Sequence, residues 1–312
     1  MTGKPKDIKR LAGRAAVEEN GWWTAHKWLV WRRVSQASML LIFLVGPLTG
    51  FWLIKGTLIS SLILDSVPLA DPLVTLQAFV AGHSLEIDAL IGTAIVLAVY
   101  AVIGGRMYCS WVCPVNVLSD GAHWLRVRLN WTRSGVHVGR GARLWILGGV
   151  LLVSAFGGVI AWEAVNPISI IHRGLVYGTL FTGGLAWMVV AGIFLVELVG
   201  GNRVWCSHLC PVGAFYGLIG NKSFLRVSAP RRDACDDCLD CFAVCPEGQV
   251  ITPALKGAKT GDGPVILSSD CTNCGRCIDV CPQKIFEFSN RFKNRPEDLV
   301  SVESPPPAKE AA

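Results

Sequence analysis

The chain has 312 residues, of which 52% are hydrophobic and only 17% are charged, and its formal net charge is +6. This length is enough for two domains, and the apolar composition excludes an ordinary soluble protein and predicts a membrane protein. A surplus of basic residues can indicate nucleic-acid binding, but its distribution along this chain favours membrane topology instead.

Four apolar stretches are long enough to cross a bilayer as helices, which takes about 20 residues each. We predict them at 35–54, 87–104, 143–162 and 180–199. Residues 1–34 are polar and basic and lack the short apolar core of a cleavable signal peptide, so the first stretch is expected to remain as an anchor. The sequence therefore predicts an α-helical membrane protein with four transmembrane helices.

Basic residues are concentrated on one side of this predicted topology. Segment 1–34 and loop 105–142 are rich in Lys and Arg, whereas the two opposite loops contain only Lys55 and Arg173. Cytoplasmic loops of membrane proteins carry the excess of Lys and Arg. We therefore expect a multi-pass protein of the bacterial cytoplasmic (inner) membrane with both termini in the cytoplasm.

A ten-residue pattern occurs twice, each time at the cytoplasmic end of an even-numbered predicted span. Its copies begin at Arg106 and Arg203, and six of their ten positions are identical, including a Cys-x-x-x-Cys-Pro motif. The repeat predicts that the membrane domain, residues 35–221, consists of two tandem two-helix units. If the copies pack about a pseudo-twofold axis, four cysteines converge: Cys109, Cys113, Cys206 and Cys210.

Three interpretations of these four cysteines remain open. They could bind a metal or a cluster, act as redox-active thiols that face the cytoplasm, or serve as small buried residues in a packed turn. Packing alone does not require two cysteines, a serine and a proline at the same offsets twice. The repetition favours redox or metal-binding thiols, and the spacing does not choose between these two functions.

Two further cysteine runs share a more specific spacing, C-x₂-C-x₂-C-x₃-C-P. They are Cys235-x-x-Cys238-x-x-Cys241-x-x-x-Cys245-Pro246 and Cys271-x-x-Cys274-x-x-Cys277-x-x-x-Cys281-Pro282. This run is typical of bacterial ferredoxins that hold two 4Fe–4S clusters, in which the fourth cysteine of each run ligates the other cluster. We expect cluster one on Cys235, Cys238, Cys241 and Cys281, and cluster two on Cys245, Cys271, Cys274 and Cys277.

Zinc and disulfides are the alternatives for these eight cysteines. Zinc sites use four ligands, and disulfide frameworks belong to exported domains, so the repeated eight-cysteine pattern fits iron–sulfur ligation better. We predict a ferredoxin-like α+β domain with two 4Fe–4S clusters at 222–294. The remaining residues, 295–312, are rich in Pro, Glu and Ala and are expected to be a disordered tail.

With these motifs the chain resembles the NapH/MauN family of ferredoxin-type membrane proteins over nearly its whole length. Besides the cysteine motifs, the resemblance rests on Asn20-Gly-Trp-Trp23, Arg32-Arg33, Gly46-Pro47, Val67-Pro-Leu-Ala-Asp-Pro72 and Trp162-Glu163-x-x-Asn166-Pro167. It implies an electron-transfer subunit of a quinol dehydrogenase, which passes electrons from quinol toward the periplasmic nitrate reductase NapAB. The implied partners are the periplasmic iron–sulfur protein NapG and the multihaem cytochrome NapC.

The same resemblance leaves other functions open. MauN proteins imply electron transfer or maturation for methylamine dehydrogenase, and a redox accessory, assembly or sensor protein is the rival class. Quinol donates two electrons and two protons, whereas a 4Fe–4S cluster accepts one electron, so a cluster pair can divide the two. Polar residues expected near the outer face are hypotheses for proton transfer: Glu163, Asn166, His172 and Arg173. The sequence does not identify the quinol site.

Overall fold

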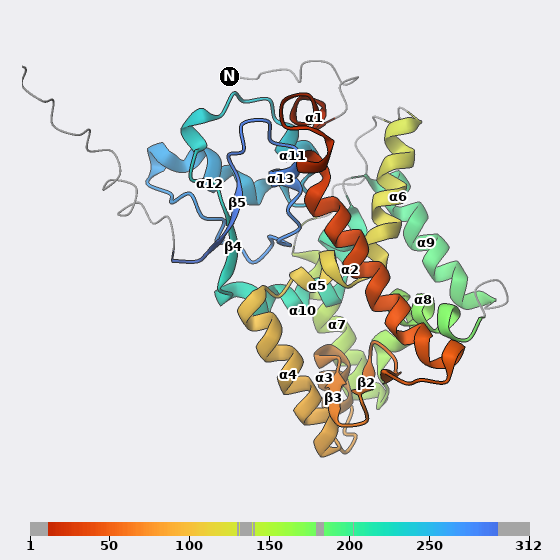
Figure 1. Ribbon diagram of the computed structural model, residues 1–312. Helices are drawn as coiled ribbons and strands as arrows, with labels where there is room; N and C mark the ends of the chain where they lie inside the picture. Colours follow the sequence, from red (N-terminus) through yellow and green to blue (C-terminus); the bar gives the residue numbers. More distant parts are fainter. Residues whose placement is uncertain are drawn as a thin grey trace, which may run out of the picture. The chain divides into compact units, whose positions relative to one another are not determined.

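The computed structural model describes residues 12–129, 131, 139, 141–178, 184–201 and 203–292 (Figure 1). The predicted disordered tail at 295–312 lies outside the described residues, as do residues 1–11 and 180–183 of two other predicted segments. The described residues form two compact units. Unit 1 contains residues 12–30 and 224–292, and unit 2 contains residues from Trp31 to Ser223.

Unit 1 combines short helices with a two-stranded antiparallel sheet, in agreement with an α+β fold. Strands β4 (Leu225–Ser228) and β5 (Glu287–Asn290) pair with Leu225 opposite Asn290. The other elements are α1 (Arg14–Asn20), the start of α2 (Trp22–Thr49), η4 (Arg232–Ala234), α11 (Asp240–Val244), η5 (Gly248–Val250), α12 (Ile251–Lys256), η6 (Gly257–Thr260) and α13 (Arg276–Asp279). A small apolar core forms between the sheet and α12, with Val227, Ile251 and Phe286 almost fully buried.

The segment before Trp31 is part of unit 1, whereas the sequence predicted a separate N-terminal segment through residue 34. The side-chain amide of Asn20 donates to the carbonyl of Pro282 at 2.7 Å, and the Gly13 N–H donates to Asp240 at 2.9 Å. The Trp28 ring contacts Phe288 edge to face, with 4.6 Å between ring centroids. These contacts join residues more than 200 positions apart, so local sequence patterns do not reveal them.

Unit 2 is mainly helical, with one small antiparallel sheet. The sheet contains β1 (Ile54–Gly56), β2 (Ser60–Ile63) and β3 (Val67–Ala70) in that order. The helices are the rest of α2, then α3 (Pro72–Val80), α4 (Ile87–Ile103), α5 (Met107–Trp111), α6 (Val115–Arg128), α7 (Ala142–Gly157), η1 (Ala161–Val165), α8 (Pro167–Val176), α9 (Leu185–Gly200), η2 (Trp205–Leu209), α10 (Pro211–Ile219) and η3 (Gly220–Lys222).

The four predicted apolar stretches correspond to α2, α4, α7 and α9. Within the described part of the chain, α2 is the one helix long and apolar enough to cross a membrane, and the other three are apolar but shorter. Helix α2 has 28 residues and begins at Trp22 rather than at residue 35, since the aromatic and basic residues before the apolar run are also helical. Helix α7 ends before Gly158, which adopts the left-handed conformation (φ 62°) and stops the helix.

Close backbone contact joins the two copies of the ten-residue pattern in unit 2. A Cβ atom on Gly105, directly before the first copy, would lie 1.8 Å from the carbonyl oxygen of Tyr216, shortly after the second copy. Gly220 has the reciprocal constraint, because its Cβ would lie 2.5 Å from the nitrogen of Gly105. Only glycine permits this approach, which brings the two Cys-x-x-x-Cys-Pro motifs into one region.

Two side-chain caps begin the short helices near the predicted outer face. Asp71 accepts hydrogen bonds from the N–H groups of Leu73 and Val74 and starts α3. Asn166 accepts from Ile168 N–H and starts α8, with a proline at the first helical position in both helices. The Asn166-Pro167 pair in the predicted Trp-Glu-x-x-Asn-Pro phrase therefore has a structural role as a helix start.

Candidate metal centres

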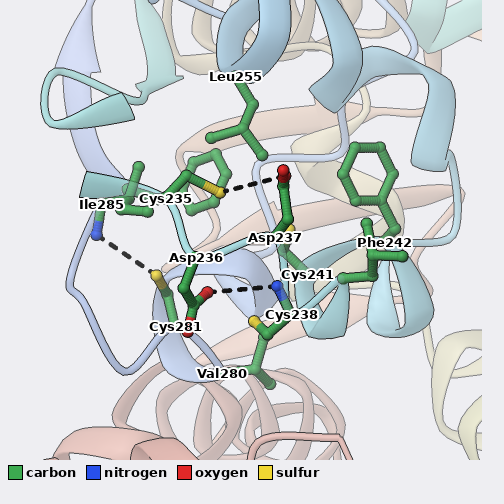
Figure 2. A pocket seen from close by; sticks show the side chains of 12 residues that line it. Cys235, Asp236, Asp237, Cys238, Cys241, Phe242, Leu255, Val280, Cys281 and Ile285 are labelled. Carbon is green, nitrogen blue, oxygen red and sulfur yellow. Dashed lines mark hydrogen bonds between the residues drawn. The ribbon is translucent and has the colours of Figure 1, made fainter. Parts of the chain in front are cut away.

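A cavity of about 340 Å³ in unit 1 is lined by four cysteines, and Figure 2 shows their side chains around it. Three of them, Cys235, Cys238 and Cys241, come from the first cysteine run, and Cys281 is the last cysteine of the second run. Leu255 and other apolar side chains form most of the remaining walls, and the exposed Asp236 and Asp237 complete the lining.

A second cavity, of about 360 Å³, is lined by the other four cysteines. It combines Cys271, Cys274 and Cys277 with Cys245 of the first run. Among the described residues, no three His, Cys, Asp or Glu side chains are close enough to hold a single metal ion. A cubane keeps its cysteine sulfurs farther apart than one ion does, because each sulfur binds a different iron atom.

The two loops that carry these cysteines have the same backbone conformation at equivalent positions. Asp237 and Asn273 precede the second cysteine of each run and have φ values of 56° and 47°. Leu239 and Gly275 follow that cysteine, with φ values of 65° and 73°. Left-handed residues at matched offsets wind each loop tightly, which allows three cysteines of one short segment to face one cavity.

Burial makes these thiols poor acids in the absence of a bound cation. It raises the pKa of Cys238 to about 11, and burial together with the neighbouring cysteines raises the pKa of Cys241 to about 12. Burial also raises the pKa values of Cys245, Cys277 and Cys281 above the usual range. Iron would supply the positive charge that favours the thiolate form, so the donor set fits a cluster with four thiolate ligands.

The two cavities differ in the charges beside them. Asp236 and Asp237 line the first cavity and are exposed. Lys256 donates to Asp237 at 2.8 Å, and this hydrogen bond lowers the pKa of the Asp237 carboxyl. Arg276 lines the second cavity and is only 6% exposed. Arg226 is also buried and donates to the Ser268 carbonyl, and its pKa is lowered by burial but raised by Cys271.

Unit 2 contains a third cysteine-lined cavity, where all four cysteines of the Cys-x-x-x-Cys-Pro motifs meet. Cys109 lies on α5 and Cys206 on η2, while Cys113 and Cys210 follow these two helical segments. The repeated pattern predicted that these four cysteines would converge, and in the structure all four line one cavity. The equivalent serines of the two copies, Ser110 and Ser207, are fully buried beside it.

Several residues at these centres were not identified from the sequence. Trp162 and Trp205 line the cavity in unit 2, and the two indole rings stack with 6.4 Å between their centroids. Glu197 is buried and accepts hydrogen bonds from Ser119 Oγ and from the backbone N–H of Cys206, the latter at 3.4 Å. The tryptophans were visible in the sequence, but only as parts of motifs and not as cavity-lining groups.

The polar residues proposed for proton transfer form a local network in unit 2. Glu163 pairs with Arg173 at 2.8 Å and accepts hydrogen bonds from Asn166 and Ser169. His172 is 1% exposed and packs edge to face against another aromatic ring, with 4.7 Å between the centroids. Three of the four predicted residues are therefore joined by an ion pair and a hydrogen bond around the start of α8, whereas His172 is buried in the packed interior.

Models of known protein families match both cysteine-rich regions. A 4Fe-4S binding domain matches residues 86–132 and 180–229, and each range contains one Cys-x-x-x-Cys-Pro motif. A 4Fe-4S dicluster domain matches residues 234–285, which contain all eight cysteines of the two cavities in unit 1.

The chain is also similar in sequence to ferredoxin-type proteins over most of their length. The ferredoxin-type protein NapH of Haemophilus influenzae is 46% identical over 95% of this chain and 100% of its own length. The methylamine utilization ferredoxin-type protein MauN of Paracoccus denitrificans is 49% identical over 89% of this chain and 95% of its own. NapH of Escherichia coli is 42% identical over 92% and 97%, respectively. No solved structure matches the chain.

Proposed function

The chain belongs to the NapH/MauN family of ferredoxin-type proteins, and we propose that it passes electrons from membrane quinol toward a periplasmic nitrate reductase of the NapAB type. Its relatives and its 4Fe–4S domains indicate a membrane iron–sulfur electron-transfer subunit. The observation that carries the proposal is the pair of four-cysteine cavities in unit 1. We infer that the subunit acts within a quinol dehydrogenase complex together with NapG-like and NapC-like partners.

Each cavity supports one cluster with crossed ligation. Cluster one is assigned to Cys235, Cys238, Cys241 and Cys281, and cluster two to Cys245, Cys271, Cys274 and Cys277. Each 4Fe–4S cluster, when bound, accepts and releases one electron. Oxidation of one quinol yields a quinone, two protons and two electrons, so two clusters can take one electron each. The cysteines would hold the clusters, and apolar side chains form most of the surrounding walls.

Two variants test the crossed ligation. Cys241→Ser should damage cluster one, and Cys245→Ser should damage cluster two, because Cys245 lies beside the cysteines of the other run. Electron paramagnetic resonance of the reduced protein should therefore lose a different signal in each variant. If both variants lose the same signal, the assignment of the fourth ligands is wrong. Iron content that neither variant lowers would exclude ligation by these residues.

The direct test of the electron donor uses membranes that contain the protein and its partners. A quinol analogue should reduce the clusters, and the reduction should appear as new electron paramagnetic resonance signals. Dithionite serves as the control that the clusters are intact and reducible. Clusters that dithionite reduces but quinol does not would reject quinol oxidation and favour a role in maturation or assembly.

We further propose that α2, α4, α7 and α9 cross the membrane, with both termini and unit 1 in the cytoplasm. The proposal is supported by four apolar helices and by the concentration of basic residues in segment 1–34 and loop 105–142. Alkaline phosphatase fused after Gly200 or Ala312 should be inactive, and a fusion after Ser66 should be active. Activity of the Ala312 fusion would overturn the orientation.

A function beside methylamine dehydrogenase is the second candidate. Two MauN proteins are 49% identical to this chain and a third is 42% identical, while the match to Haemophilus NapH, at 46%, extends over that protein's whole length. Deletion of the gene distinguishes the two functions. Loss of growth by periplasmic nitrate reduction supports the NapH function, and loss of growth on methylamine alone supports the MauN function.

A further inference from the structure

The cavity in unit 2 is comparable to the two cavities of unit 1. Its volume is about 380 Å³, against about 340 and 360 Å³ for the cavities lined by the ferredoxin-type runs. Each of the three is lined by four cysteines and otherwise mostly by apolar side chains. The similar volume and the same number of cysteines make the third cavity comparable to the two in unit 1 as a site for a bound group.

The four cysteines of this cavity come from both copies of the repeat. Cys109 and Cys113 belong to the first Cys-x-x-x-Cys-Pro motif, and Cys206 and Cys210 belong to the second. Two thiols therefore line the cavity from each copy. As in unit 1, three of them are not close enough to share a single metal ion, among the residues that the structure describes.

Two buried hydrogen-bond donors point to what the cavity binds. Trp162 is 4% exposed, and its indole N–H has no hydrogen-bond partner in the described structure. The indole N–H of Trp205 is equally buried and without a partner, and both tryptophans line the cavity. A buried N–H group without an acceptor is costly, whereas the sulfur atoms of an iron–sulfur cluster accept such bonds and are tuned by them.

Buried side chains of both charge signs contact the backbone around the cavity, because Glu197 accepts the N–H of Cys206 while two arginines donate to carbonyl groups. Arg106 is 2% exposed and donates to the carbonyl of Cys206 at 3.2 Å. Arg143 is 8% exposed and donates to the carbonyl of Ser207 at 3.3 Å. A 4Fe–4S core with four thiolate ligands has a net negative charge, which is expensive to bury unless positive groups lie nearby. The two guanidinium groups provide this compensation and outnumber the buried carboxyl group of Glu197.

We propose that Cys109, Cys113, Cys206 and Cys210 bind a third 4Fe–4S cluster, and that Trp162 and Trp205 donate hydrogen bonds to its sulfur atoms. The cluster would accept one electron and release one electron, with no bond to the protein formed or broken. The eight cysteines of unit 1 remain assigned to clusters one and two. The protein therefore has three one-electron centres, and one of them lies in the unit that carries the apolar helices.

Iron content is the first test. Full-length protein purified in detergent without oxygen should contain about 12 iron atoms and about 12 acid-labile sulfides per chain, four of each per cubane. The Cys109→Ser/Cys206→Ser double variant should lose about one third of the iron and keep both electron paramagnetic resonance signals of unit 1. Cys241→Ser is the matched control and should lose a signal of unit 1 instead.

Iron and sulfide contents can also contradict the third cluster. Double-variant protein with the same iron and sulfide content as the unsubstituted chain excludes a cluster on these thiols. Thiols that pair reversibly as disulfides, with about eight iron atoms per chain, would identify the four cysteines as a redox-active thiol set. If Cys241→Ser also leaves the iron content unchanged, the assignment of unit 1 fails as well, and the two failures are thereby distinguished.

A second variant avoids any change in the thiols. Trp162→Phe removes the indole N–H and retains an aromatic ring, so the third cluster should remain and its reduction potential should fall, because the donated hydrogen bond stabilises the more negative reduced form. A redox titration followed by electron paramagnetic resonance should show this shift in one signal only. A titration without a third signal, or with all potentials unchanged in Trp162→Phe, contradicts the proposal.

Discussion

The carboxylate of Asp279 accepts the backbone N–H of Trp28 at 3.0 Å and the adjacent Leu29 N–H at 2.9 Å. Asp279 lies between Cys277 and Cys281, which line different cavities of unit 1. The start of α2 is therefore attached to the segment that connects the two proposed clusters.

Substitution Asp279→Ala should destabilise unit 1. It removes the carboxylate that accepts two backbone N–H groups in a partly buried position, and a hydrogen bond to a charged group contributes about 1.5–3 kcal/mol. Thermal unfolding of the full-length protein, followed by loss of the visible absorbance of the clusters, should shift to lower temperature. Glu19→Ala is the control, since Glu19 is exposed on α1 and should change stability by less than about 0.5 kcal/mol. Equal effects of both substitutions would show that the contact contributes nothing.

The substitution Gly275→Ala tests the close approach between the second cysteine run and α2. A Cβ atom at this position would lie 2.7 Å from the Cβ of Trp28, and the backbone has φ 73°. Gly275→Ala should therefore lower the stability of unit 1 and the occupancy of cluster two, by a cost above the roughly 1–3 kcal/mol of left-handed strain alone.

The matched control for Gly275 is another glycine of unit 1. Gly261 has a similar φ of 80°, but a Cβ atom there would have no neighbour within 4 Å. Gly261→Ala thus carries the conformational strain without the collision. Iron content and thermal unfolding should be affected more by Gly275→Ala than by Gly261→Ala, and the reverse order would contradict the structure.

The different charges beside the two cavities of unit 1 predict different reduction potentials. Buried Arg276 stabilises the more negative reduced form of cluster two, while Asp236 disfavours the reduced form of cluster one. Arg276→Gln should lower the potential of cluster two. The change should be on the order of 60 mV, the one-electron equivalent of about 1.4 kcal/mol.

The reciprocal substitution is Asp236→Asn, which should raise the potential of cluster one. Its effect should be smaller, because Asp236 is exposed and water screens its charge. A redox titration followed by electron paramagnetic resonance measures both potentials in the same sample. Shifts of the wrong sign, or a shift confined to the other cluster, would contradict the assigned positions of these charges.

Asp71 predicts a pH dependence of the stability of unit 2. Burial raises its pKa to about 6, although the backbone hydrogen bonds that it accepts at the start of α3 oppose this effect. The folded state therefore retains a proton that the unfolded state, with a pKa near 3.8, has already released. Stability due to this group is complete below about pH 4 and is lost as the pH rises toward 6, by on the order of 2 to 3 kcal/mol.

Asp71→Asn isolates that contribution. Asparagine retains the cap acceptor and does not titrate, so the variant should lose less stability than the unsubstituted protein between pH 4 and pH 7. Thermal unfolding in detergent across this range provides the measurement. Identical pH profiles for the two proteins would mean that Asp71 ionises in the folded state as readily as in the unfolded chain.

Much of the candidate site was predictable, because cysteine spacing encodes ligand geometry locally. Three cysteines within seven residues must lie on one short loop, and the proline after each fourth cysteine marks the ferredoxin-type run. The two cavities of unit 1 contain the two sets of four that this spacing predicts. Apolar stretches likewise predicted α4 and α7 to within a few residues at their starts, because helix formation by apolar runs is a local property.

Other features depend on residues far apart in the chain. The start of α2 belongs to unit 1 because Asp279, Pro282 and Phe288 contact it, and no local pattern links these positions. The indole groups of Trp162 and Trp205 likewise line one cavity from different helical segments, and the guanidinium of Arg143 donates to the carbonyl of Ser207. The sequence alone predicted which cysteines form each set, because the spacing of the cysteines identifies them. It also indicated the family of the chain, because short sequence motifs are shared with that family. Only the tertiary structure decided which polar and charged groups surround those thiols, because their positions result from long-range packing rather than from neighbours in the sequence.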